Sequence, residues 1–133
     1  MIWLLDTNVL IHAVRGRPAA VRSRLRAVSP QDVAVSSITV AELWYGAEKS
    51  PEPKRKREAW RLVLQPFEVL PFDGEAAEHH ARLRHALRRQ PIGERDLLIA
   101  AIAIARGLSL VTHNAAEFAR VQDLHVEDWT RPV

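Results

Sequence analysis

The chain has 133 residues, of which 47% are hydrophobic and 26% charged, and this is the composition of one compact globular domain. It contains no cysteine, so disulfide scaffolds, zinc–thiolate sites and cysteine nucleophiles are excluded. Its 19 lysines and arginines against 16 acidic residues give a net charge of +3. Most of these cations are arginine, which is common in, though not restricted to, proteins that bind phosphate groups.

Short apolar runs alternate along the chain with longer amphipathic segments. The runs expected to form strands span residues 2–5, 33–36, 67–71, 108–112 and 125–127. The segments expected to form helices span 8–14, 19–28, 39–48, a basic stretch that follows the 49–57 turn and ends near 64, 73 to about 89, 94–106 and 115–121. This alternation predicts an α/β fold with a central, mostly parallel sheet of four to five short strands, covered by helices on both faces.

Neither of two apolar runs in the sequence suggests export or membrane insertion. The apolar run at the start is shorter than the core of a signal peptide and meets an acid at Asp6. The run at 97–105 is far below the length that spans a membrane. We therefore expect a cytoplasmic protein without a membrane segment.

Acidic side chains follow the predicted strands at the edge where parallel sheets bind ligands. Asp6 directly follows the first strand, and Glu42 lies in the first turn of the helix after the second. Asp96 begins the helix that leads to the fourth strand, and Asn114 and Glu117 follow that strand. Crowded carboxylates repel one another unless a hard cation such as Mg²⁺ or Mn²⁺ neutralises them. The sequence therefore predicts a metal site suited to phosphoryl chemistry.

Each acid also has a local structural explanation. Asp6 can be the N-cap of the first helix, and the pair Thr39 and Glu42 matches a capping box. Asp96 lies in a first helical turn, where the helix dipole favours any acid. These explanations do not predict that the acids share one pole of the sheet, and this coincidence favours the metal site.

Four segments carry a resemblance to a known family: LLDTNVLI at 4–11, SSITVAELWYGAEKS at 36–50, PIGERDLLIAAIAIARGLSLVTHNAAEF at 91–118 and RVQDLHVEDW at 120–129. The chain resembles the PIN-domain ribonucleases, and among them the VapC-type toxins of bacterial toxin–antitoxin pairs. The resemblance implies a single PIN domain over 1–133 with a PIN-like three-layer α/β/α sandwich. It also implies a Mg²⁺-dependent endoribonuclease, with Mn²⁺ as a substitute, that forms a homodimer and a higher assembly with a cognate VapB-type antitoxin.

The resemblance also assigns roles to the clustered residues. Asp6, Glu42 and Asp96 fall on the family's three main acidic positions, which makes them both metal ligands and catalytic residues. Asn114 stands where many relatives have an aspartate, so it keeps the catalytic position without the charge, which Glu117 is expected to supply through water. The supporting residues that the resemblance implies are Thr7, Ser37 and Thr112.

The expected substrate is RNA, with transfer RNA as one target that the resemblance suggests, and its hydrolysis is expected to leave a 5′-phosphate and a 3′-hydroxyl. Basic residues expected to cradle the RNA backbone, or else to form a solvated face, are Arg15, Arg17, Arg22, Lys54 and Arg55. Apolar residues expected to line an antitoxin groove, or else to belong to the core, are Val14, Leu43 and Trp44.

Three other functions fit parts of the pattern. A haloacid-dehalogenase-like phosphatase needs an aspartate two residues after Asp6, where this chain has Asn8. A phosphate-receiver domain needs an aspartate at the end of the third strand, which closes here with Leu70 and Pro71. A non-catalytic RNA- or protein-binding module on the same fold, in which the acids are only helix caps, therefore remains the alternative.

Overall fold

The computed structural model describes residues 1–131. The strands are β1 (Trp3–Leu5), β2 (Val33–Ser36), β3 (Glu68–Leu70), β4 (Ser109–Val111) and β5 (Val126–Glu127). The helices are α1 (Thr7–Arg15), α2 (Ala19–Ala27), α3 (Ser37–Glu48), α4 (Pro53–Leu64), α5 (Gly74–Ala86), α6 (Glu94–Arg106) and α7 (Ala115–Phe118), with a short 3₁₀ turn at Pro30–Asp32. The predicted elements are all present, and most of their ends agree within two residues.

The expected ends of two helices are wrong. Helix α5 begins after its predicted cap, Asp73, whose carboxylate accepts a hydrogen bond from the Ala76 amide, but it ends at Ala86 rather than near residue 89. The chain turns there because both the amide and the guanidinium of Arg88 donate to the His85 carbonyl. Helix α7 ends at Phe118 rather than at 121, where the Val121 amide turns back to the Phe118 carbonyl.

The sheet has five strands in the order β3-β2-β1-β4-β5, and every neighbouring pair is parallel. Strand β1 lies at the centre, with Leu5 opposite Val35 on one side and Val111 on the other. Because all the strands run the same way, their carboxyl ends meet at one edge. The residues that follow β1, β2 and β4 are therefore brought together, although they are far apart in sequence.

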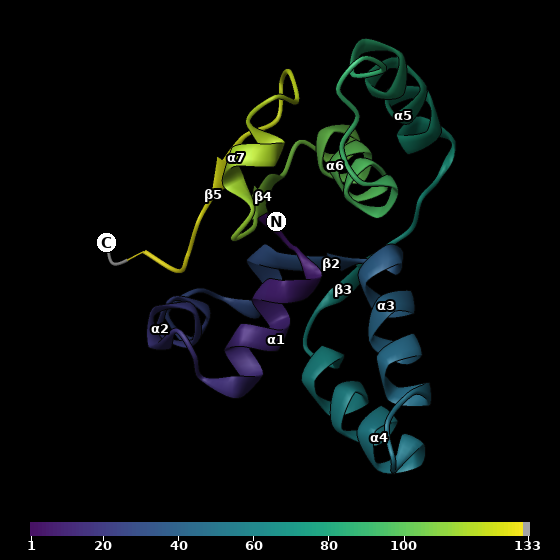
Figure 1. Ribbon diagram of the computed structural model, residues 1–133. Coiled ribbons are helices and arrows are strands. Elements are labelled where there is room, and N and C mark those ends of the chain that lie inside the picture. Colours follow the sequence, from purple (N-terminus) through teal and green to yellow (C-terminus); the bar gives the residue numbers. More distant parts are fainter. Residues whose placement is uncertain (132–133) are drawn as a thin grey trace.

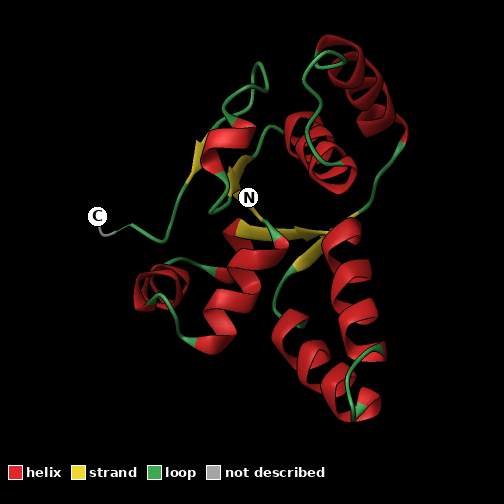
Figure 2. Ribbon diagram, in the orientation of Figure 1, coloured by secondary structure: helices red, strands yellow, loops and turns green. Residues whose placement is uncertain are grey.

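The sheet separates two apolar cores, as expected for a three-layer α/β/α sandwich (Figures 1 and 2). Leu4 points into the core under α5, α6 and α7, whereas its neighbour Leu5 points into the core under α1 to α4. This alternation is why the inner strands β1, β2 and β4, which are covered on both faces, read as nearly continuous apolar runs. Within residues 1–131, none of the helices combines the length and the apolar character needed to cross a membrane.

Candidate active site

The carboxyl edge of the sheet collects the acids that the sequence singled out. Asp6 directly follows β1 and is 6% exposed, although it stands at the N-cap position of α1. Its carboxylate makes no side-chain cap bond to α1, so the N-cap alternative does not account for it. Instead, Asp6 Oδ2 accepts a hydrogen bond of 2.8 Å from the hydroxyl of Thr112, which follows β4.

Burial raises the pKa of Asp6 above its ordinary value of 3.8. The hydrogen bond from the Thr112 hydroxyl lowers it again, as does the adjacent backbone amide of Thr7, and the negative charges of Glu42 and Glu117 raise it. Thr112 is fully buried and also accepts a bond of 3.0 Å from the Asn114 amide. One hydroxyl thus ties Asp6 to the loop that carries Asn114.

Replacing Thr112 with valine is expected to destabilise the protein by about 1–3 kcal/mol, because the buried Asp6 carboxylate and the Asn114 amide each lose a partner. The comparison is urea unfolding of Thr112→Val against Thr112→Ser at neutral pH, since serine keeps the hydroxyl and removes only the methyl group. Equal unfolding midpoints for the two variants would mean that the hydroxyl contributes nothing measurable.

Glu42 projects from the first half of α3 toward α1. The Thr7 hydroxyl lies 2.9 Å from Glu42 Oε1 and 3.0 Å from the Thr39 hydroxyl, which is itself fully buried. The capping-box alternative for Thr39 and Glu42 is wrong, because α3 begins earlier and Ser36 caps it by accepting from the Thr39 amide at 3.0 Å. Glu42 therefore does not take part in capping α3, and its position needs another explanation.

The supporting threonines lie where the resemblance implies, whereas Ser37 does not contact the acids. Thr7 touches Glu42, and Thr112 touches Asp6. Across the described residues Ser37 makes no side-chain hydrogen bond to either acid, and Thr39 occupies that place in the network. The sequence analysis assigned Thr39 only to a cap. Its spacing of three residues from Glu42, one helical turn, is the signal that places both on the same face.

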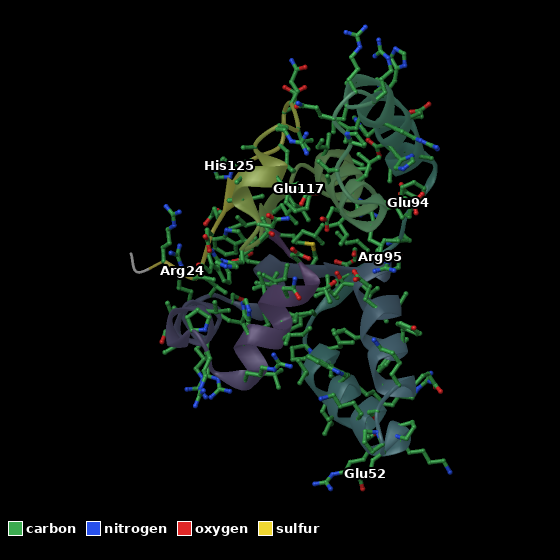
Figure 3. The ribbon with its side chains drawn as sticks, viewed as in Figure 1. Arg24, Glu52, Glu94, Arg95, Glu117 and His125 are labelled. Atoms are coloured by element: carbon green, nitrogen blue, oxygen red, sulfur yellow. The ribbon has the colours of Figure 1, made fainter. Side chains whose placement is uncertain are left out.

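Glu117 adds a fourth carboxylate from α7. Its Oε1 accepts a bond of 3.0 Å from the Gly93 amide, and its Oε2 accepts from the side-chain amide of Asn114. Gly93 immediately precedes α6, the helix that carries Asp96. Glu117 therefore joins the loop after β4 to the start of α6, and Figure 3 shows it on the side of α7 that faces α6.

Asp96 carries the clearest electrostatic mark of this crowding. Burial, together with the negative charges of Asp6, Glu117 and Glu42, raises its pKa from 3.8 to about 6, whereas the positive charge of Arg95 lowers it. The sequence predicted that four separate parts of the chain bring acids together, and the mutual repulsion of these acids is consistent with that arrangement. A strongly shifted carboxyl in a cluster of this kind is typical of functional sites.

The donor set fits a hard divalent cation, because it consists of carboxylate and amide oxygens without sulfur. Across residues 1–131, however, no three acidic or histidine side chains converge closely enough to enclose an ion. The carboxylates are turned instead toward protein partners: Glu42 toward Thr7, Glu117 toward Gly93, and Asp6 toward Thr112. The chemistry of the donors and their repulsion favour a cation, whose binding would require these side chains to turn away from their present partners.

Arg95 is a site residue that the sequence analysis missed. Its guanidinium lies 3.7 Å from Glu42 Oε2 while the side chain remains 71% exposed, so this ion pair is weakly held. A hollow of about 310 Å³ is lined by Glu42, Arg95 and Asp96, together with Gly93 and Glu94. Figure 3 shows Arg95 at the beginning of α6, facing α3. In the sequence, only the position of Arg95 next to Asp96 indicates that it lies at the site.

The basic residues expected to contact RNA do not form one surface. Arg15 lines a groove beside Glu42, whereas the Arg22 guanidinium donates to the carbonyls of Ala13 and Val14 and so holds the end of α1. Arg55 pairs with Glu52 on the exposed side of α4. Arg17 and Lys54 are also exposed.

Comparison with known proteins places the chain in a defined group. The family model described as the PIN domain matches residues 3–124. The chain is 41% identical over 130 residues to the tRNA(fMet)-specific endonuclease VapC of Shigella flexneri, an alignment that covers 96% of this chain and 98% of that protein. It is 40% identical over 129 residues to Ribonuclease VapC2 of Haemophilus influenzae, covering 96% and 97% respectively.

Solved structures agree with this placement. DNA-bound VapBC from Salmonella typhimurium matches with a TM-score of 0.89 and 38% identity, covering 97% of this chain and 98% of that one. FitAcB from Neisseria gonorrhoeae matches with a TM-score of 0.87 and 31% identity, covering 98% and 100%. The three-layer fold inferred from the sequence is thus the fold of these proteins.

Proposed function

The chain belongs to the PIN-domain family as a VapC-type ribonuclease toxin, and on this basis we propose that it cleaves initiator transfer RNA in a reaction that requires a divalent cation. The observation that carries the proposal is the convergence of Asp6, Glu42, Asp96 and Glu117 at the carboxyl edge of the sheet, where burial and mutual repulsion raise the pKa of Asp96. The substrate assignment follows the Shigella flexneri and Salmonella typhimurium relatives, which are named as tRNA(fMet)-specific.

Each residue of the site has a proposed part in hydrolysis. Asp6 and Asp96 hold Mg²⁺ or Mn²⁺, and Glu42 completes the site and orients or deprotonates the attacking water. A bound Mg²⁺ supplies charge that polarises the scissile phosphate and offsets the charge on the leaving oxygen. The water oxygen bonds to phosphorus as the bond to the 3′-oxygen breaks, which leaves a 5′-phosphate and a 3′-hydroxyl.

The neighbouring residues keep these groups in place. Thr7 holds Glu42 and Thr112 holds Asp6 through the hydrogen bonds described above. Asn114 positions the substrate or a water molecule, and Glu117 supplies the charge that an amide at position 114 lacks. We also propose that residues 1–133 form one PIN domain that acts in the cytoplasm as a homodimer.

The toxin is paired with an antitoxin of the VapB type. The relatives from Salmonella typhimurium and Rickettsia felis were solved as VapBC assemblies bound to DNA. We propose that this chain likewise forms a higher assembly with its cognate antitoxin, which neutralises the ribonuclease until it is released.

The test is cleavage of initiator tRNA by the antitoxin-free protein with Mg²⁺, with EDTA, and in the Asp6→Asn variant. We expect cleavage only in the first reaction, with elongator methionine tRNA left intact and a 5′-phosphate on the product. Equal cleavage in all three reactions would remove the metal-dependent mechanism. RNA binding without cleavage under any condition would favour the non-catalytic binding module.

A further inference from the structure

The second half of α5 and the turn that follows it carry a cluster of exposed arginines. The segment RLRHALRR at 82–89 has four arginines and one histidine but no acid, since both acids of α5, Glu75 and Glu78, lie in its first half. Arg120 joins this cluster from the end of α7, because its guanidinium donates a hydrogen bond of 2.7 Å to the Gln90 carbonyl. We call this surface the arginine patch, and its members, all exposed, are Arg82, Arg84, Arg88, Arg89 and Arg120.

The positive charge of the arginine patch is not balanced within the protein. On the other basic helix, α4, Arg55 pairs with Glu52 at 3.5 Å and Arg61 pairs with Glu58 at 2.6 Å. Within residues 1–131, by contrast, no arginine of the patch forms an ion pair with a carboxylate. A hollow of about 420 Å³ on the same surface is lined by His80, Ala81, Arg84, His85 and Arg88. Such uncompensated charge favours an anionic partner.

The arginine patch lies at the same end of the molecule as the acid cluster. Helices α5 and α6 pack side by side as an antiparallel pair (Figure 1), since Asp73, just before α5, lies 3.7 Å from Arg106 at the end of α6. The end of α5 is therefore beside the start of α6, which carries Asp96. The turn between the two helices is also tied to the site, because Glu117 accepts a hydrogen bond from the Gly93 amide.

The arginine patch and the groove beside Glu42 lie on opposite faces of the sheet. Helix α5 covers the core that contains Leu4, whereas the groove is formed by α1, α3 and α4 on the other face. The groove is lined largely by apolar side chains, including Val14 and Leu43, and it suits an apolar segment of a protein. The arginine patch presents charge instead, so the two surfaces suit partners of different chemistry.

The chemistry of the arginine patch matches the phosphate backbone of RNA. A guanidinium binds phosphate through two parallel hydrogen bonds, and several adjacent guanidinium groups suit a chain of phosphates. A second copy of this chain is a poor match, because a two-fold interface uses the same surface of both copies and would bring the arginines together. The proposed substrate is itself a polyanion, whose scissile bond has to rest at the acids beside this surface.

We infer that the arginine patch binds the phosphate backbone of the substrate tRNA outside the cleaved segment and so positions the tRNA over the acid cluster. The inference rests on the proposed ribonuclease function and adds substrate-positioning residues to it. These arginines contact the tRNA away from the reacting atoms, so they act on binding rather than on the chemical step. Their loss therefore raises KM and leaves kcat nearly unchanged.

The test is steady-state cleavage of initiator tRNA by the double variant Arg84→Gln/Arg89→Gln over a range of salt concentrations. KM is expected to rise about tenfold at low salt, and the slope of log KM against log salt should fall by roughly 2, about one for each lost phosphate contact. Both side chains are exposed, so the variant is expected to fold normally, which thermal unfolding checks. A wild-type KM and salt slope in the folded variant would overturn the inference.

The matched control is the double variant Arg55→Gln/Arg61→Gln. It removes the same number of positive charges from α4, where each arginine already pairs with an acid. Its KM and salt slope for tRNA are expected to stay close to those of the wild type. An effect as large as that of Arg84→Gln/Arg89→Gln would mean that only the net charge of the protein matters, and it would contradict a defined binding surface.

A short single-stranded RNA that carries only the mapped cleavage site separates the arginine patch from the acid cluster. This RNA occupies the acids without extending over α5, so the wild type and Arg84→Gln/Arg89→Gln are expected to cleave it with the same KM. The advantage of full-length tRNA over the short RNA should therefore shrink in the variant. An equal loss on both substrates would mean that the substitutions disturb the acid cluster itself, and it would overturn the inference.

The outcomes separate failure of the inference from failure of the proposed function. If the wild-type protein cleaves no tRNA, the proposed function fails, and the inference that rests on it fails too. If the wild type cleaves tRNA and the patch variant has the same KM and salt slope, only the inference fails. If the variant instead loses binding to the purified antitoxin, or changes its oligomeric state in sedimentation, with KM for tRNA unchanged, the surface belongs to a protein interface.

Discussion

Replacing Asp96 with asparagine is expected to make the metal-free protein more stable and to lower its ribonuclease activity by about a hundredfold or more. The stabilisation arises because asparagine removes a half-buried negative charge that three neighbouring carboxylates repel. The expected rise in Tm at pH 7.5 is about 3–5 °C, a modest value because the side chain is only partly buried and solvent screens its charge. The measurements are thermal unfolding in EDTA and tRNA cleavage in Mg²⁺.

The gain in stability has a defined pH dependence. The pKa of Asp96 is about 6 in the folded protein against an ordinary value of 3.8, so the folded state binds the proton more tightly than the unfolded state. The penalty of the ionised Asp96 is absent below about pH 4, grows as the pH rises, and is complete above about pH 6. The difference in Tm between Asp96→Asn and the wild type should therefore shrink as the pH falls from 7.5 to 4.

A matched control is Glu78→Gln, which removes one negative charge from the exposed surface of α5. It is expected to leave both Tm and tRNA cleavage close to the wild type. If Asp96→Asn lowers the Tm in EDTA, or if its stability gain is the same at pH 4 and pH 7.5, the repulsion among the carboxylates is not what shifts Asp96.

Adding Mn²⁺ or Mg²⁺ is expected to reverse this order of stability. A ligand that binds only the folded state contributes about 2.7 kcal/mol at a hundred times its Kd, which corresponds to a rise of roughly 8–15 °C in Tm for a chain of this size. The wild-type protein should show this rise. Asp96→Asn and Asp6→Asn should lose most of it, since each removes a charged oxygen that we propose as a ligand of the cation.

Protons compete with the cation for the same oxygens, so the rise in Tm with Mn²⁺ should diminish as the pH falls through 6, where Asp96 takes up a proton. Calorimetric titration with MnCl₂ provides an independent measurement of binding. An equal rise in wild type and Asp96→Asn would place the cation elsewhere on the protein. No rise and no heat of binding in the wild type would remove the cation from the proposal.

Much of the fold could be predicted because the ends of most strands and helices are determined by residues close to them in the sequence. The apolar runs of β1 and β2 are short and end at polar residues, and Gly107 ends α6 in the left-handed conformation that glycine adopts at helix ends. The end of α5 depends instead on the turn around Arg88, which no spacing of apolar residues reports. The order of the inner strands was also outside the reach of the pattern, because β1, β2 and β4 are all largely apolar and buried.

The acids of the site could be located from topology alone, because parallel strands bring whatever follows them to one edge. Their hydrogen-bond partners could not. Thr39 and Glu42 read equally well as a capping box, and only the start of α3 at Ser37 separates the two readings. The contact between Arg95 and Glu42 joins α6 to α3 through a long side chain, and sequence spacing does not reveal such contacts.

The order of the strands makes the activity a property of the nearly finished chain. The central strand β1 is the first to leave the ribosome, but one of its two neighbours, β4, is made only after Asp96 and α6. Thr112, which holds Asp6, follows β4. A nascent or truncated chain that ends before α6 therefore lacks both Asp96 and the hydroxyl that supports Asp6, and we expect it to be inactive.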